Sequence, residues 1–420
     1  MTTPSVTIDA AAVEAATERL SGVIARTPLE RSARLSAATG ADVWLKREDL
    51  QVVRSYKVRG AYNLIAQLDD AAREAGVVTA SAGNHAQGVA YACAALGVKG
   101  RVHLPRTTPR QKRDRIAAIG GDMIEMVVGG ETYDEVAGLA RSESEHGATL
   151  VPAFDDPRTI AGQGTVVQEA VEQLGTAPDV VVLPVGGGGL LAGSVTWLRE
   201  RHPETRIVAV EPAGAACLAA ALEAGEPVVL ESIDTFIDGA AVRRAGDHTF
   251  AAVRDADVEM LAVPEGRVCT EMLDLYQTDG IIAEPAGALA ASVLRDREYV
   301  RVEPGQTVLC VLSGGNNDVS RYAEVVERSL VHEGRKHYFL VEFAQEPGAL
   351  RRFLDEVLGP DDDITLFEYV KHNNRETGPA LVGIELSRAE DHPALLERMA
   401  AAPLQIEPID ADSPVFRFLL

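Results

Sequence analysis

The chain has 420 residues, and 46% of them are hydrophobic, which is enough for two or three domains with well-filled cores. Its 63 acidic and 40 basic residues give a formal net charge of −23, which argues against nucleic acid and anionic membranes as partners. No signal-peptide pattern and no uncharged apolar stretch of transmembrane length is visible. The cysteines lie far apart without a CxxC pair, which indicates reduced thiols in a cytoplasmic protein: Cys93, Cys217, Cys269 and Cys310.

The first third of the chain begins with a predicted helix over residues 8–22 and a short strand over 41–49. The stretch QVVRSYKVRGAYNLI (51–65) then predicts an amphipathic helix, because its apolar residues recur at helical spacing. Lys57 lies one residue outside that apolar face, so spacing alone favours an ordinary surface lysine. The apolar face consists of Val58, Ala61, Tyr62 and Ile65.

One pattern then occurs three times: a short apolar run, a loop of small residues and a helix. It covers VVTASAGNHAQGVAYACAALG (77–97), 179–201 and 307–330. Continuous Val and Leu runs are typical of strands buried on both faces of a parallel sheet, and such units indicate an open α/β fold. Ligands in these folds bind at the carboxyl ends of the strands, so the three loops are candidate walls of one site.

The second loop, VGGGGLLAG (185–193), has four consecutive glycines before a helix. Their backbone N–H groups can close on a phosphate at the helix N-terminus with no side chain in the way. A second interpretation stays open, because Gly187-x-Gly189-x-x-Ala192 fits a dinucleotide fingerprint and Glu211 ends the next apparent strand. In that case the protein would be an NAD-dependent dehydrogenase.

The other loops carry polar groups. SAGNHAQG (81–88) offers hydroxyl and amide groups with free backbone N–H groups at a helix N-terminus, which suits a substrate carboxylate. Ser313 lies at the third strand end, and Glu284 lies in AEPAGA (283–288), a predicted turn into a helix.

The composition changes near residue 331. Residues 331–337 are a predicted linker, and residues 338–420 follow the order βαββαβ, the ferredoxin-like arrangement. A module of this size without a catalytic constellation is either a dimerisation or packing module or a small-molecule sensor.

Taken together and in this order, TPLERSARLS, VWLKREDLQVVRSYKVRGAYN, SAGNHAQG, VGGGGLLAG, AEPAGA and LSGGNN resemble the threonine dehydratases over residues 27–325. These are pyridoxal-phosphate enzymes of the tryptophan-synthase β-subunit fold. The resemblance implies PLP fold type II in residues 1–330, with two open α/β subdomains, the smaller over about 54–154. The C-terminal α+β module (338–420) resembles a single ACT-like regulatory domain of the biosynthetic enzymes.

The resemblance also implies roles for residues. Lys57 matches the lysine that forms a Schiff base with pyridoxal 5'-phosphate and removes the substrate Cα proton. Asn84 matches the partner of the pyridoxal 3-hydroxyl, and Ser313 the partner of the pyridine nitrogen. The implied phosphate-binding residues are Gly186, Gly187, Gly188, Gly189 and Leu190. The implied substrate-binding residues are Ser81, Ala82, Gly83, Asn84 and His85, with Ser81 counted as catalytic.

No metal is expected, because Cys217 stands where relatives with a divalent cation place an acid. A serine opposite the ring nitrogen is neutral and limits delocalisation of a carbanion into the ring, which suits β-elimination.

The implied reaction converts L-threonine into 2-oxobutanoate and ammonia, the first step of isoleucine biosynthesis. The expected enzyme is a cytoplasmic homotetramer that isoleucine inhibits, with valine as a candidate activator. Four alternatives remain open: a catabolic threonine/serine dehydratase, a β-replacement enzyme such as a cysteine synthase, an NAD-dependent dehydrogenase and a non-catalytic amino-acid sensor.

Overall fold

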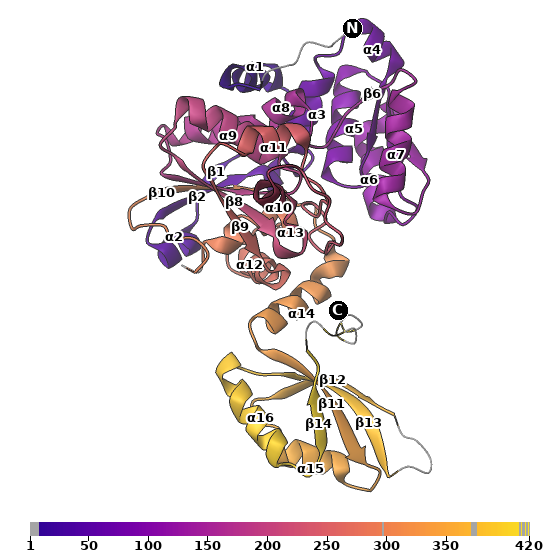
Figure 1. Ribbon diagram of the computed structural model, residues 1–420, viewed down its shortest axis with the longest axis vertical. Coiled ribbons are helices and arrows are strands. Elements are labelled where there is room, and N and C mark those ends of the chain that lie inside the picture. Colours follow the sequence, from indigo (N-terminus) through magenta and orange to yellow (C-terminus); the bar gives the residue numbers. More distant parts are fainter. Residues whose placement is uncertain are drawn as a thin grey trace. The chain divides into compact units, whose positions relative to one another are not determined.

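The computed structural model describes residues 8–295, 298–370 and 376–410, together with Ser413, Phe416 and Leu419 (Figure 1). The chain forms two compact units. The first contains residues 1–265 and 274–317, and the second contains residues 266–273 and 318–420.

The larger sheet of the first unit has six strands in the order β1-β2-β10-β7-β8-β9. All neighbours are parallel except β1 and β2. Every residue of β7 is buried, as expected for a strand covered on both faces. The strands are β1 (Leu29–Arg31), β2 (Asp42–Arg47), β10 (Thr307–Leu312), β7 (Val180–Pro184), β8 (Arg206–Pro212) and β9 (Val258–Val263).

The smaller sheet is parallel and has the order β5-β4-β3-β6. Its strands are β5 (Ile124–Val128), β4 (Gly100–Leu104), β3 (Val77–Ala80) and β6 (Thr149–Leu150). Helices cover both faces, since Val78 packs with Val136 on one side and Val77 with Val89 on the other. The prediction of two open α/β subdomains is confirmed, and the three predicted strands divide between the two sheets.

The helices begin and end largely where local sequence signals place them. The helix predicted from residue 8 begins after Asp9, whose carboxylate accepts the N–H of Ala12. The helix after β3 ends at Gly97, which adopts the left-handed conformation (φ 67°) that a C-cap glycine provides. The helices of this part of the chain are α1 (Ala10–Leu20), α2 (Ala33–Thr39), α3 (Lys57–Ile65), α4 (Asp70–Ala75), α5 (Asn84–Leu96), α6 (Arg110–Gly120), α7 (Tyr133–Ser144), α8 (Pro157–Leu174), α9 (Gly189–Arg201), α10 (Cys217–Ala224), α11 (Asp247–Val253), α12 (Glu265–Gln277) and α13 (Pro285–Ala288). Short 3₁₀ turns are η1 (Glu48–Leu50), η2 (Gly121–Met123), η3 (Ala213–Ala215) and η4 (Ala291–Val293).

The predicted helix and the burial of its apolar face are confirmed, but the rest of helix α3 is buried as well after its first residue. Glycines of two neighbouring helices allow this burial. A Cβ at Gly88 of α5 would lie 3.1 Å from the carbonyl carbon of Lys57. A Cβ at Gly162 of α8 would lie 2.7 Å from the Cα of Gly60. Both helices therefore contact the backbone of α3 directly, which fixes the position of its first turn.

The second unit contains the predicted βαββαβ module, and its strands form an antiparallel sheet in the order β12-β13-β11-β14. This is the ferredoxin-like arrangement, so that prediction is confirmed. The predicted linker, residues 331–337, holds the end of α14 and the start of β11, and residues 371–375 lie outside the described residues. The elements are η5 (Val319–Arg321), α14 (Tyr322–His332), β11 (Lys336–Ala344), α15 (Ala349–Glu356), β12 (Asp363–Tyr369), β13 (Thr377–Glu385), η6 (Ala389–Asp391), α16 (His392–Ala401) and β14 (Gln405–Pro408).

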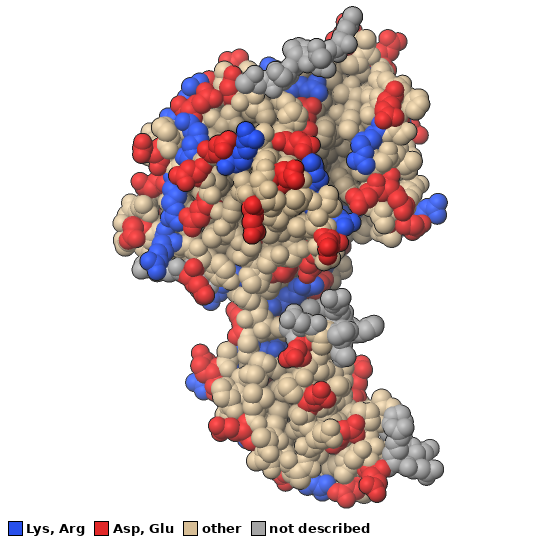
Figure 2. All heavy atoms as spheres, in the orientation of Figure 1, with Lys and Arg blue, Asp and Glu red and all other residues tan. Residues whose placement is uncertain are grey.

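Figure 2 shows acidic side chains scattered over one face of both units, and basic side chains that gather in a stripe along the left side of the first unit. Within the described ranges, no helix has the length and apolar character needed to span a membrane.

Candidate active site

Lys57 is the first residue of α3 and lies at the carboxyl end of the larger sheet. Its Nζ donates to the carbonyl of Ala153 at 3.2 Å. The backbone of the preceding residue, Tyr56, donates to the carbonyl of Ser313 at 3.2 Å, directly after β10. The loop before α3 is therefore held against the strand end that carries Ser313.

Ser313 is 3% exposed, and its hydroxyl donates to the carbonyl of Ala286 in α13 at 3.1 Å. Gly314 and Ser55 form an isolated bridge beside it. These contacts place a neutral hydroxyl beside the loop that leads into Lys57.

The loop after β3 brings its polar groups to the N-terminus of α5. Ser81 Oγ accepts the N–H of Gly83 at 3.3 Å, and Asn84 begins the helix. His85 is 3% exposed, and its Nε2 contacts the carbonyl of Val151 at 2.8 Å. Burial, with a smaller contribution from nearby Lys57, lowers the pKa of His85 to about 4, so the ring is neutral at physiological pH.

The glycine loop leads from β7 into α9 without a side-chain cap. In the described part of the chain, the amides of Gly186, Gly187 and Gly188 donate to no protein acceptor. Gly188 has φ of +89°, a conformation that favours glycine, and Thr249 Oγ1 donates to the carbonyl of Gly187 at 2.8 Å. Unpartnered amides at a helix N-terminus fit a phosphate group.

The segment after β6 links the lysine to the glycine loop, and the sequence analysis missed it. A Cβ at Gly187 would lie 2.4 Å from ring atoms of Phe154, so this ring packs directly on the loop. The adjacent Ala153 carbonyl is the acceptor for Lys57. Asp155 accepts the N–H groups of Asp247 and His248 at 3.0 and 2.8 Å, which fixes the segment. No local sequence pattern marks these residues.

Glu284 is 6% exposed and accepts a hydrogen bond from Asn84 Nδ2 at 2.5 Å. Burial, together with nearby Asp238, raises the pKa of Glu284 to about 7. The loop that carries Asn84 thus meets the AEPAGA turn and the end of β10.

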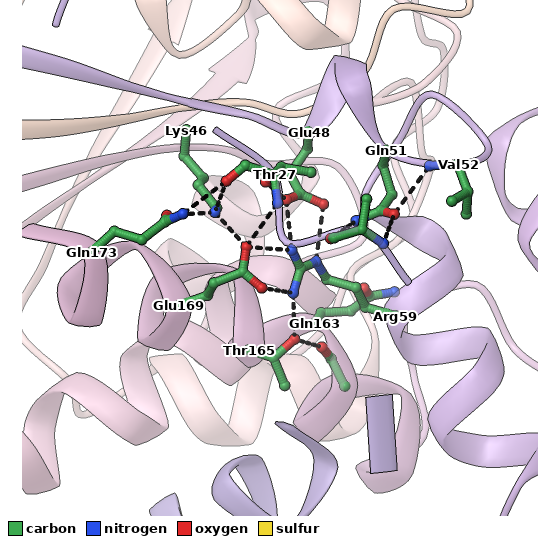
Figure 3. A network of polar contacts seen from close by, with 12 residues as sticks. Thr27, Lys46, Glu48, Gln51, Val52, Arg59, Gln163, Thr165, Glu169 and Gln173 are labelled. Carbon is green, nitrogen blue, oxygen red and sulfur yellow. Dashed lines mark hydrogen bonds and ion pairs between the residues drawn. The ribbon is translucent and has the colours of Figure 1, made fainter. Parts of the chain in front are cut away.

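A network of buried charges joins β2, η1, α3 and α8 (Figure 3). Arg59 uses all five N–H donors of its guanidinium group. Two go to Glu48, two to Glu169 and one to Thr165, at 2.7–3.2 Å. The coulombic attraction of both carboxylates outweighs burial and raises the pKa of Arg59.

Lys46 completes the network. Its Nζ donates to Glu169, Gln173 and the carbonyl of Thr27 at 2.5–2.8 Å. The two cations, Lys46 and Arg59, are balanced by two carboxylates, so the network is neutral overall, as burial of charged groups requires. It anchors α3 two residues after Lys57.

Glu211 has a different role from the one that a dinucleotide site requires. Its carboxylate accepts the N–H groups of Leu218 and Ala219 at 2.8 and 2.9 Å, which caps α10. Burial raises the pKa of Glu211 to about 7, and that of Cys217 to about 12, so the thiol is neutral. Cys217 Sγ donates to the carbonyl of Gly186 at 3.6 Å. Among the described residues, no cluster of three or more His, Cys, Asp or Glu side chains suits a metal ion.

Comparison with known families agrees with this geometry. Residues 20–314 match the family described as pyridoxal-phosphate dependent enzyme, and residues 327–419 match the C-terminal regulatory domain of threonine dehydratase. The biosynthetic L-threonine dehydratase IlvA of Mycobacterium tuberculosis is 61% identical over 420 residues, which cover 99% of this chain and 97% of that protein. The Bacillus subtilis protein of the same name is 48% identical over 404 residues, 96% of this chain and 95% of that protein.

Among solved structures, the processed form of threonine deaminase isoform 2 from Solanum lycopersicum matches with a TM-score of 0.71 and 38% identity. The match covers 76% of this chain and 92% of that one. Maize serine racemase matches with a TM-score of 0.71 and 29% identity, over 78% and 99% of the two chains.

One chain thus contains both the pyridoxal-phosphate dependent enzyme domain and the C-terminal regulatory domain of threonine dehydratase. The chain belongs to the pyridoxal-phosphate dependent enzymes, and within them to the biosynthetic L-threonine dehydratases. The cofactor of this family is pyridoxal phosphate.

Proposed function

We propose that the protein catalyses the β-elimination of L-threonine to 2-oxobutanoate and ammonia, as the committed step toward isoleucine. The observation that carries this proposal is the joining of the Lys57 loop to the Ser313 strand end, with residues 153–154 leading from the lysine to the glycine loop. An NAD-dependent dehydrogenase is not favoured, because Glu211 caps a helix. A catabolic role is not favoured either, because a regulatory domain is present.

Each group of active-site residues has a separate role in the proposed reaction. Pyridoxal phosphate, when bound, supplies an aldehyde and a ring that withdraws electrons from the substrate Cα. Lys57 anchors the cofactor and removes the Cα proton with its amine. Asn84 would donate to the ring oxygen, and the Ser313 hydroxyl would be the partner of the ring nitrogen. The amides of Gly186, Gly187, Gly188, Gly189 and Leu190 would hold the phosphate.

The loop Ser81, Ala82, Gly83, Asn84 and His85 holds the substrate carboxylate, because the N-terminus of α5 offers N–H groups and a favourable dipole. His85 serves this loop as a neutral side chain.

The second unit supports a proposal of feedback control by isoleucine, with valine as an activator and a homotetramer as the working assembly. A hollow of about 480 Å³ lies on this unit, lined partly by Glu342, Thr377 and Leu404. Its volume is sufficient for an amino acid, and its lining offers both a carboxylate and apolar surface.

The activity is tested by measuring oxoacid formation from threonine and from serine. Lys57→Ala should lower turnover by about 10²–10⁴-fold or more, because both the base and the anchor are lost. Lys99→Ala is the matched control, since Lys99 is exposed and its Nζ donates to the carbonyl of Asp122. Near-normal turnover by Lys57→Ala, or a requirement for a nicotinamide cofactor, would contradict the proposal.

A further inference from the structure

A chain of hydrogen bonds leads from the loop before Lys57 to the carboxylate of Glu284. Asn316 Nδ2 donates to the carbonyl of Val53 at 2.8 Å and to Oδ1 of Asn84 at 2.7 Å. Asn84 Nδ2 then donates to Oε1 of Glu284 at 2.5 Å. The three side chains come from the end of β10, the start of α5 and the turn before α13.

The two ends of this chain determine how both amide groups are oriented. A backbone carbonyl can only accept a hydrogen bond, so Asn316 must turn its nitrogen toward Val53. The same nitrogen then meets the oxygen of Asn84, which leaves the nitrogen of Asn84 facing Glu284. Turning either amide over would place oxygen against oxygen at one end of the chain.

The orientation leaves one donor free. The amide of Asn84 has two N–H groups, and one of them is used by Glu284. Within the described part of the chain, the second N–H meets no protein acceptor. We infer that Glu284 and Asn316 are positioning residues that hold Asn84 so that this second N–H faces the ring oxygen of bound pyridoxal phosphate. The inference rests on the proposed function of Asn84.

Burial of Glu284 limits the access of water to the hydrogen bond between Asn84 and Glu284. Glu284 is 6% exposed, and its backbone N–H donates to the carbonyl of Gly314 at 3.1 Å, so the backbone holds this residue beside Asn84. A Cβ at Gly314 would lie 2.3 Å from Glu284 Oε1, so the backbone of this loop approaches the carboxylate closely. Water therefore has little room to replace Glu284 as the acceptor for Asn84.

The test replaces the side-chain amide of Asn316, which donates hydrogen bonds, by a carboxylate of the same shape, which can only accept them. In Asn316→Asp, carboxylate oxygens would face the carbonyl of Val53 and the oxygen of Asn84, so Asn84 could keep its orientation only against repulsion. We expect the dissociation constant of pyridoxal phosphate from the apoprotein to rise about tenfold or more, because a hydrogen bond to a charged ring oxygen is lost. We also expect a shift in the absorbance maximum of the bound cofactor.

Asn317→Asp is the matched control. Asn317 Nδ2 also donates to a backbone carbonyl, that of Ala283 at 3.1 Å, in the same loop. This hydrogen bond to the carbonyl of Ala283 does not involve Asn84, so we expect the variant to bind the cofactor within about twofold of the parent protein, a change well under one neutral hydrogen bond.

A second pair of variants decides the question if Asn316→Asp does not fold. Glu284→Gln keeps a carbonyl oxygen for Asn84 and should retain most of the affinity, whereas Glu284→Ala should not. Equal cofactor affinity and absorbance in Glu284→Gln, Glu284→Ala and the parent protein would overturn the inference. Failure of the parent protein itself to bind pyridoxal phosphate would instead refute the proposed function.

Discussion

Burial gives the side chain of His85 a lower pKa in the folded protein than in the unfolded chain. The pKa is about 4 in the folded protein, against an ordinary value of 6.5. The unfolded chain therefore binds a proton first as the pH falls, so the stability contributed by the neutral ring is complete above pH 6.5 and is lost between pH 6.5 and about 4. The loss is on the order of 3 kcal/mol.

The variant His85→Gln tests this prediction, because a glutamine can still donate to the carbonyl of Val151 and does not titrate. We expect its urea midpoint to fall less steeply than that of the parent protein between pH 6.5 and 4. His337 and His392, whose pKa values burial also lowers, are present in both proteins and cancel in the comparison. Equal slopes would show that His85 titrates normally.

Ser313 allows a prediction about reaction specificity. Ser313→Ala should weaken binding of pyridoxal phosphate by about 1 kcal/mol, the value of one neutral hydrogen bond. Ser313→Asp should favour a protonated ring nitrogen and divert part of the reaction toward transamination. Cofactor dissociation constants and product analysis measure both effects.

Ser292→Ala is the control for Ser313. Its hydroxyl is also buried and donates to a carbonyl, that of Leu289 at 2.8 Å. If Ser313→Asp gives the same products as the parent protein, Ser313 does not face the ring nitrogen.

Helix α3 is held by ion pairs between Arg59 and carboxylates outside the helix. Arg59→Lys replaces a guanidinium group with five N–H donors by an ammonium group with three. Carboxylate oxygens of Glu48 or Glu169 would then lack a hydrogen-bond partner in the interior. Breaking a buried ion pair costs about 3–5 kcal/mol, so we expect a large loss of stability in urea unfolding. Arg201→Lys, in an exposed pair with Glu14, should change stability little. A small effect of Arg59→Lys would mean that water enters the network.

The elements that sequence predicted well are those with a local signal. The strands that end near Ser81, Gly186 and Ser313 are continuous apolar runs, and the glycines and caps that follow them are local as well. The resemblance to a known family then supplied the roles of Lys57 and Asn84, which spacing alone did not.

The parts of the site that sequence did not predict are contacts between distant residues. Arg59 and Glu169 are 110 positions apart, and Phe154 packs on Gly187, which belongs to a different loop of the chain. The burial of α3 escaped detection for the same reason, because Arg59 looks like a surface residue until its partners are known. Pairing across such distances leaves no periodic pattern in one sequence.

At the scale of the whole molecule, chemistry and regulation should be separable. The proposed active-site residues all precede Asp318, whereas the ferredoxin-like sheet begins at Lys336. A chain that ends at Gly334 keeps α14 and the contact between the hydroxyls of Thr270 and Ser329 at 3.0 Å. We expect it to retain threonine dehydratase activity and to lose inhibition by isoleucine.

Typical allosteric coupling of about 1–3 kcal/mol corresponds to inhibition of the full-length enzyme by roughly 5- to 150-fold, which a rate assay detects easily. Light scattering on the same samples reports whether the proposed homotetramer forms in each protein. Inhibition that persists in the shortened chain would place the sensor in the first unit. A full-length enzyme that ignores isoleucine would favour the catabolic role.

The wide spacing of the active-site residues along the chain also affects how the enzyme acquires its cofactor. Asn84 meets residues 200 and 232 positions later in the sequence, so these contacts close only after most of the first unit has been synthesised. Contacts of such high sequence separation form slowly, because long loops must close first. During refolding, helical signal should therefore return before cofactor absorbance does. A cofactor that binds only the completed site stabilises that state by mass action, so pyridoxal phosphate supply should govern how much newly made enzyme escapes proteolysis.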